Sequence, residues 1–365
     1  MHLIISLLLF SSCTWALESG SLINRKSKAL QNTQDATDHQ MCSFEYHLLR
    51  HKKSVERPNI IFKNIISHDA TIVVAASKNQ IELFNSSLQP QAALSNEDVK
   101  NPNKDLMLSA LNKTLVVLKE KNCSAFDVET QKETNLQLKC PAKRAVFIDE
   151  NIFAAATLAG ISLYDLRIKQ EVECVDHKKN TVNALDNLEK ETLLASGYTN
   201  GLVSLWDLRN PEKPLHEWSK NTSQSHRIMD LVHTDKHIIW LNDEYRLSLA
   251  DSVGNDSVVS YKLPYKNKGS HHHPCLSKVN AHIIALAYKD RIRIIDLSSY
   301  QFHSVELKGE LPHTLYEMAG HDEFYVTTHL CSITGKNSTI QKWTLATQEE
   351  VDFIEKKTIT PKKNN

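Results

Sequence analysis

Two segments of the sequence end in an Asp-X-Arg triplet after an aromatic residue: Tyr-Asp-Leu-Arg at residues 164–167 and Trp-Asp-Leu-Arg at residues 206–209. An aspartate in a turn accepts hydrogen bonds from nearby backbone N–H groups, and an arginine offers several N–H donors in a planar fork. Arginine is also enriched where proteins bind other proteins. The triplets therefore predict two exposed binding residues, Arg167 and Arg209. A purely local role, in which each arginine only stabilises its own turn, stays open as the alternative.

Residues that could support catalysis or metal binding do not gather into a recognisable motif. The sequence holds no glycine-rich phosphate loop, no Gly-X-Ser-X-Gly segment and no His-Glu-X-X-His pair. His271, His272 and His273 are adjacent, so on an extended loop their imidazoles diverge and cannot share one ion. The acidic pairs at residues 243–244 and 349–350 are chain neighbours, and nothing places them across a cleft. The sequence therefore predicts a protein that is not an enzyme and has no metal site and no cofactor.

The second Asp-X-Arg triplet closes a hairpin that the chain repeats. Residues 193–211 (LLASGYTNGLVSLWDLRNP) predict strands over 193–197 and 202–208 around a tight turn. Similar hairpins recur at intervals close to the roughly 40–45 residues of a propeller blade. Their second strands close on Phe84, Phe126, Tyr164, Trp206, Leu249, Ile295 and Trp343. These seven copies predict an all-β fold, a seven-bladed β-propeller of four-stranded antiparallel blades over residues 42–355.

The best-formed copy resembles the WD-repeat β-propeller family. In that family a histidine before the first strand, a Ser or Thr on the second strand, an aspartate in the turn and the tryptophan of the third strand share hydrogen bonds. His177, Ser196 and Trp206 match this pattern, whereas Asn200 stands where the family usually has aspartate. The other copies match less well, so the resemblance implies a degenerate member of the family. The alternative is an unrelated β-sandwich with one accidental match.

The Asp-X-Arg triplets resemble the box by which WD-repeat substrate receptors dock on the adaptor of cullin-four ubiquitin ligases. Paired arginines on adjacent blades contact the adaptor in those receptors, which implies this role for Arg167 and Arg209. The chain departs from the family pattern at Asn200 and at Tyr164, which stands in place of a tryptophan. This function requires a location in the cytosol or nucleus.

The opposite rim of a propeller is formed by the turns between the second and third strands of each blade. On that rim the sequence places five further candidate binding residues, all of them aromatic or cationic: Tyr198, Tyr245, Arg246, Lys121 and Lys289. Tyrosine and arginine are frequent anchors of protein interfaces because they combine contact area with hydrogen-bond donors. An ordinary solvated rim of turn charges is the alternative.

The two ends of the chain lie outside the predicted propeller. Residues 1–16 have the profile of a secretory leader, with an apolar core followed by Thr14 and Ala16 at the positions of a cleavage site. A wrong first exon in the gene model is the alternative, and it restores a location in the cytoplasm or nucleus. Residues 17–41 are predicted to be a flexible polar lead-in, and residues 356–365 a frayed basic tail. Residues 43–49 are expected to supply the outer strand that completes the last blade.

Composition narrows the class of partner. Lys plus Arg and Asp plus Glu balance at 43 each, so no net field draws the chain towards nucleic acid. No apolar run of membrane-spanning length follows the leader. We therefore expect a non-catalytic scaffold that binds a protein or peptide on one rim, as a monomer within a larger complex and without a small-molecule substrate. The alternatives are the ubiquitin-ligase receptor and a secreted propeller hydrolase or lectin that uses the central channel.

Overall fold

The structure is a computed structural model that describes a large part of the chain between residues 49 and 345. The described residues are 49–57, 64–67, 72–76, 80–85, 87–95, 103–108, 113–119, 123–136, 138, 141–158, 160–176, 180–188, 192–218, 226–252, 257–263, 275–280, 282–288, 291–297, 301–306, 311–317, 323–332 and 335–345. The predicted leader, lead-in and tail lie outside these residues.

The described residues form β-strands and no helix, and the strands pair into four-stranded antiparallel sheets. Sheet 1 has the order β2 (Asn64–Ser67), β3 (Ile72–Ala76), β4 (Gln80–Asn85) and β5 (Pro90–Ser95). Sheet 2 has the order β6 (Asn103–Leu108), β7 (Thr114–Lys119), β8 (Cys123–Asp127) and β9 (Glu133–Leu136). Sheet 3 has the order β10 (Ala142–Phe147), β11 (Ile152–Thr157), β12 (Gly160–Asp165) and β13 (Gln170–Asp176).

The remaining sheets follow the same meander. Sheet 4 contains β14 (Val182–Leu188), β15 (Leu193–Tyr198), β16 (Val203–Asp207) and β17 (His216–Trp218). Sheet 5 contains β18 (Ile228–His233), β19 (His237–Asn242), β20 (Arg246–Asp251) and β21 (Val258–Lys262). Sheet 6 contains β22 (Cys275–Asn280), β23 (Ile283–Tyr288), β24 (Arg291–Asp296) and β25 (Gln301–Glu306). Sheet 7 contains β26 (Leu311–Glu317), β27 (Glu323–Ser332), β28 (Gly335–Leu345) and, as its last strand, β1 (Leu49–Arg57).

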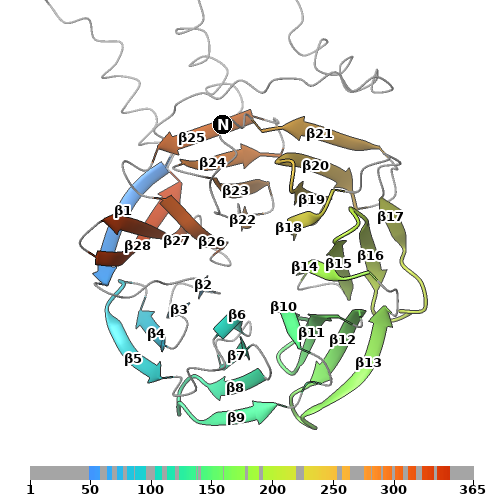
Figure 1. The fold of residues 1–365 in the computed structure, drawn as a ribbon, viewed down its shortest axis with the longest axis horizontal. Helices are drawn as coiled ribbons and strands as arrows, with labels where there is room; N and C mark the ends of the chain where they lie inside the picture. The colour runs from blue at the N-terminus through green and yellow to red at the C-terminus, as the bar shows by residue number, and fades with distance from the viewer. Residues whose placement is uncertain are drawn as a thin grey trace, which may run out of the picture.

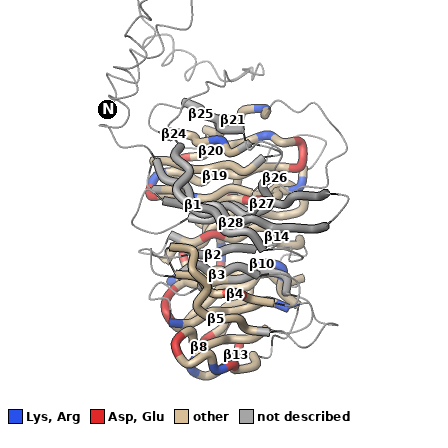
Figure 2. The backbone as a smooth tube through the Cα atoms, turned by 90° about the vertical axis from the view of Figure 1, so that its left-hand side faces the viewer, with Lys and Arg blue, Asp and Glu red and all other residues tan. Residues whose placement is uncertain are grey.

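The sheets have a β-propeller-like arrangement. Figure 1 shows the first strand of each sheet on the inner side of a ring and the last strand on its outer side. The view at right angles shows strands of successive sheets side by side, with positive and negative residues interspersed along them (Figure 2). The predicted all-β class and the four-stranded antiparallel sheets are confirmed.

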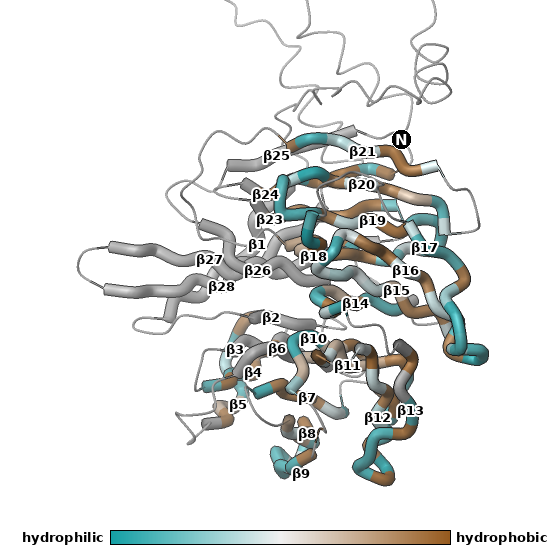
Figure 3. The backbone as a smooth tube through the Cα atoms, turned by 45° about the vertical axis from the view of Figure 1, so that its right-hand side comes forward, coloured by the Kyte–Doolittle hydropathy of each residue, from teal (hydrophilic) through white to brown (hydrophobic). Residues whose placement is uncertain are grey.

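Packing between neighbouring sheets explains the apolar runs of the middle strands. Every residue of β12 is buried, and Ala154, Ala155 and Ala156 of β11 have no exposed surface. The sequence of a strand that is covered on both faces is a continuous run of apolar residues. One hydrophobic cluster joins Leu163 of sheet 3 to Leu194 and Trp206 of sheet 4, and similar clusters join other neighbouring sheets. Figure 3 shows hydrophobic stretches along these strands and hydrophilic stretches at the turns.

The strand that completes sheet 7 differs from the predicted one. Strand β1 (Leu49–Arg57) pairs antiparallel with β28, whereas the sequence predicted this role for residues 43–49, of which 43–48 lie outside the described residues. The charged sequence LRHKKSVER explains the difference, because natural edge strands carry lysine and other charged residues that discourage further pairing. Among the described residues, the observed strand overlaps the predicted segment only at Leu49.

Among the described residues, no helix has the length and apolar character needed to cross a membrane.

Candidate protein-binding face

The first Asp-X-Arg triplet forms the turn between β12 and β13. Asp165 is the last residue of β12, and its Oδ1 accepts a hydrogen bond from the Arg167 backbone N–H at 2.8 Å. The guanidinium folds back on the same carboxylate, with Arg167 Nε 3.0 Å from Asp165 Oδ1 and Nη2 2.5 Å from Oδ2. The Asp165 side chain is 8% exposed and that of Arg167 is 64% exposed. The buried partner therefore orients an arginine that faces solvent.

The second triplet repeats this geometry in the turn between β16 and β17. Asp207 Oδ1 accepts from the Arg209 backbone N–H at 3.0 Å, and Arg209 Nη2 lies 2.7 Å from Asp207 Oδ2. The Arg209 side chain is 74% exposed, against 16% for Asp207. The Thr192 hydroxyl also donates to Asp207 Oδ1 at 3.3 Å, which ties the turn to the neighbouring β14–β15 connection. Two consecutive sheets thus present the same bidentate arginine–aspartate contact at the same end.

A side-chain oxygen of Asp or Asn alone is enough to cap this turn in other sheets. After β4, Asn85 Oδ1 accepts the Ser87 backbone N–H at 3.0 Å, and after β8, Asp127 Oδ1 accepts that of Thr130 at 2.7 Å. Neither of these turns carries an arginine at the corresponding position, yet both form. Turn formation therefore does not explain the arginines of sheets 3 and 4.

The hydrogen bonds from the arginines lower the pKa values of both aspartates. Hydrogen bonding by the Arg167 side chain holds the pKa of Asp165 at about 2, and Arg209 does the same for Asp207, whose pKa is also about 2. The hydrogen bond to the Asp165 carboxylate, and then its negative charge, raise the pKa of Arg167. Both pairs therefore stay ionised at any pH above about 4.

The double variant Asp165→Asn, Asp207→Asn should respond less to acid than the native chain. A folded-state pKa of about 2, below the ordinary 3.8, gives stability that is present above pH 4 and lost as the pH falls towards 2. We expect the difference in thermal midpoint between the two proteins to shrink over that interval. Asp127→Asn is the matched control for a turn cap without an arginine. A difference that stays constant from pH 5 to pH 2 contradicts the prediction.

Exposed apolar side chains accompany the arginines. Ile168, in the same turn as Arg167, is 54% exposed, and Leu215, at the end of the β16–β17 connection, is 51% exposed. The Leu215 backbone N–H donates to the Leu205 carbonyl at 2.7 Å, which holds that residue beside β16. We call Arg167, Ile168, Arg209 and Leu215 the Asp-X-Arg face. Sequence reasoning missed its two apolar members, although an apolar residue directly after a turn arginine is a signal that could have found Ile168.

The hydrogen bonds inside sheet 4 join its second and third strands. Trp206 Nε1 donates to Ser196 Oγ at 2.9 Å, and Ser196 Oγ lies 3.2 Å from the Tyr198 hydroxyl oxygen. All three side chains are buried. Asn200 is exposed and accepts the Leu202 backbone N–H at 3.2 Å, so its role is local to the turn. His177 lies outside the described residues.

Of the residues expected on the opposite rim, the three that the structure describes do not form one exposed surface. Tyr198 was expected to be exposed, and this is wrong: β15 extends through Tyr198, so its ring packs between sheets 3 and 4 with no exposed surface. Tyr245 is half-buried against the cluster between sheets 5 and 6, and Arg246 is half-buried at the start of β20. Lys121 and Lys289 lie outside the described residues.

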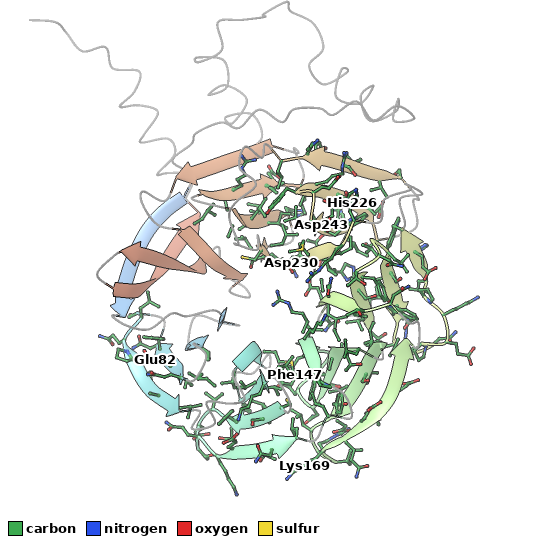
Figure 4. All side chains as sticks on the ribbon, viewed as in Figure 1. Glu82, Phe147, Lys169, His226, Asp230 and Asp243 are labelled. Atoms are coloured by element: carbon green, nitrogen blue, oxygen red, sulfur yellow. The ribbon has the colours of Figure 1, made fainter. Side chains whose placement is uncertain are left out.

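The described part of the chain contains no group of three or more His, Cys, Asp or Glu side chains that could hold a metal ion. The histidines at residues 271–273 lie outside it. Figure 4 shows the described side chains on the ring, with Lys169, from the same turn as Arg167, at the outer edge.

Comparison with known proteins finds no match to this chain among protein-family models or curated proteins.

Proposed function

We propose that this chain is a seven-bladed WD-repeat β-propeller that binds a protein or peptide on its Asp-X-Arg face and catalyses no reaction. The observation that carries the proposal is the repeated geometry of Arg167 and Arg209, each bonded to a shielded aspartate and each more than half exposed. Consecutive sheets present these two arginines in the same way, as expected for a surface that recognises one partner at two points.

Closure of the ring is supported by contacts between segments far apart in the sequence. Inner strand β2 lies beside β26 and also beside β6, and each later inner strand neighbours the next. Strand β1, from the N-terminal side of the propeller, pairs with β28 near its end. Sheet 7 combines β1 with β26, β27 and β28, so it joins the first described strand to the last three. Such a sheet can hold the ring of a propeller together.

The chemistry of the face favours a protein or peptide partner with acidic and apolar groups. A guanidinium already oriented by a largely shielded carboxylate loses little side-chain freedom on binding, so less of the contact energy is spent on ordering it. Ile168 and Leu215 supply apolar surface that a partner can cover, which excludes water from the neighbouring charged contacts. Arginine contacts surrounded by such surface dominate the binding energy of many interfaces.

The variant Arg167→Ala, Arg209→Ala should weaken partner binding by about 30-fold or more, as expected when interface residues worth about 2 kcal/mol are lost. Partners would be captured from cells with the native chain and identified, and the affinity of each purified partner would then be measured. Arg227→Ala is the matched control, because Arg227 is exposed at the opposite end of sheet 5. Equal affinity of the native chain and the double variant would refute the proposed face.

The pairing of the arginines on consecutive sheets also supports a narrower candidate, a substrate receptor that docks on the adaptor of cullin-four ubiquitin ligases. A pull-down with the purified adaptor tests it directly. We expect binding by the native chain and loss of binding by the double variant. Absence of binding by the native chain removes this candidate and leaves the broader proposal standing.

A further inference from the structure

Side chains of the inner strands connect neighbouring sheets through hydrogen bonds to backbone groups. Asp186 Oδ2, on β14, accepts the His233 backbone N–H of β18 at 2.6 Å. Asp230 Oδ2, on β18, accepts the Leu276 backbone N–H of β22 at 2.8 Å. Two carboxylates thus bond sheet 4 to sheet 5 and sheet 5 to sheet 6. Figure 4 shows Asp230 on the inner side of the ring.

Two amide side chains of β14 extend this series. Asn187 Nδ2 donates to the Phe147 carbonyl of β10 at 2.8 Å, which links sheet 4 to sheet 3. Asn183 Nδ2 donates to the Ile228 carbonyl of β18 at 3.2 Å. Both amides are buried, so these bonds form away from water, where a lost hydrogen bond is most costly. Sheets 3 to 6 are therefore bonded in sequence around the inner strands.

Titratable and charged residues stand on the inner strands packed against β14, which carries Asp186, and against β18. His233 and Asp230 belong to β18, Lys278 belongs to β22, and Lys143 and Arg144 belong to the adjacent inner strand β10. Burial raises the pKa of Asp186 to about 7, opposed by the backbone bonds from His233 and Asn187 and by the Lys278 charge, while the Asp230 charge raises it further. The carboxyl group changes its charge near neutral pH as a result.

His233 is the second unusual group of this cluster. Its side chain has no exposed surface, and neither ring nitrogen has a hydrogen-bond partner among the described residues. Burial lowers the pKa of His233 to about 4, and the charge of Lys278 lowers it further. The imidazole therefore stays neutral in the folded protein at pH values where a histidine in water becomes charged.

We propose that Asp186, His233 and Lys278 form a proton-responsive clasp between inner strands β14, β18 and β22, in which proton uptake at the Asp186 carboxyl changes how tightly sheets 4, 5 and 6 are held together. The ionised carboxylate accepts more strongly from the His233 backbone N–H and attracts Lys278. The protonated carboxyl avoids the desolvation of a buried charge and the repulsion from Asp230. Because the two forms hold the sheets differently, the clasp responds to pH.

The two titrations have opposite effects on stability. Asp186 has a folded pKa near 7, above the ordinary 3.8, so its contribution is complete below pH 4 and is lost as the pH rises through 7. His233 has a folded pKa near 4, below the ordinary 6.5, so its contribution is present above pH 6.5 and is lost as the pH falls towards 4. Between pH 4 and pH 6.5, the stability that the native chain loses through Asp186 as the pH rises is opposed by the stability that it gains through His233.

Single substitutions separate the pH dependence of stability that is due to Asp186 from that due to His233. Asp186→Asn removes the contribution of the carboxyl group and keeps that of His233, so the folding equilibrium constant should rise by on the order of tenfold or more from pH 4.5 to pH 6.5. His233→Gln removes the contribution of the imidazole and keeps that of Asp186, so the constant should fall by a similar factor from pH 4.5 to pH 7.5. Urea unfolding at each pH measures both. Glu129→Gln, at an exposed turn of sheet 2, is the matched control and should keep the pH profile of the native chain.

Carbon-13 NMR of the native chain labelled at the aspartate carboxyl carbons tests the clasp without a substitution. We expect one aspartate carboxyl resonance to titrate near neutral pH, and that resonance to be absent from Asp186→Asn if the variant folds. Parallel pH profiles for Asp186→Asn and His233→Gln would overturn the proposal. A native spectrum in which every aspartate titrates below pH 5 would overturn it as well.

Discussion

Trp206→Ala should lower the free energy of unfolding by about 3–5 kcal/mol, the usual range for removing a buried aromatic side chain. Trp206 is 2% exposed and packs between sheets 3 and 4 with Leu163, Leu194 and Tyr198. The substitution leaves a cavity between two sheets and also removes the N–H that donates to Ser196 Oγ. Urea unfolding followed by circular dichroism measures the loss.

Trp206→Phe separates the hydrogen bond from the packing. It keeps an aromatic ring but removes the donor to Ser196, so we expect a loss of about 1–3 kcal/mol. Trp218→Phe is the matched control, because Trp218 is also buried and its Nε1 has no hydrogen-bond partner among the described residues. If Trp206→Phe is no more destabilising than Trp218→Phe, the hydrogen bond to Ser196 contributes nothing to stability.

Removal of strand β1 should have a comparably large effect. A chain that begins after Arg57 lacks the outer strand of sheet 7, which pairs with β28 over residues 49–57. Cross-strand pairs contribute roughly 0.2–1 kcal/mol each, so we expect a loss of about 2–8 kcal/mol of unfolding free energy. The strand β28 becomes an unpaired edge, which favours association between chains.

The control for this deletion is a chain that begins at residue 48 and keeps β1. Urea unfolding compares the stability of the two truncated chains, and light scattering compares their association. We expect the longer one to match the full chain and the shorter one to be less stable and to associate. Equal stability of the two truncated chains would show that β1 does not hold sheet 7 together.

The repeat and the turns could be predicted from the sequence because both depend on residues close together in the chain. The residues predicted to close each hairpin, among them Phe84, Tyr164 and Trp206, all lie on the third strand of a sheet. The Asp-X-Arg turns depend on groups two residues apart, so their chemistry is readable without the fold. The limits of the strands depend on packing as well, since β15 extends one residue beyond the predicted strand and places Tyr198 in the core instead of on the rim.

By itself, then, the sequence determined the all-β class, the period of the sheets and the local geometry that turns Arg167 and Arg209 towards solvent. Only the tertiary structure decided which segment completes sheet 7, that Ile168 and Leu215 are exposed with the arginines, and that Asp186 bonds to His233. The physical reason is distance along the chain. Asp186 and His233 are 47 residues apart, and packing of one sheet against the next brings them together. No local pattern of residue types encodes that contact.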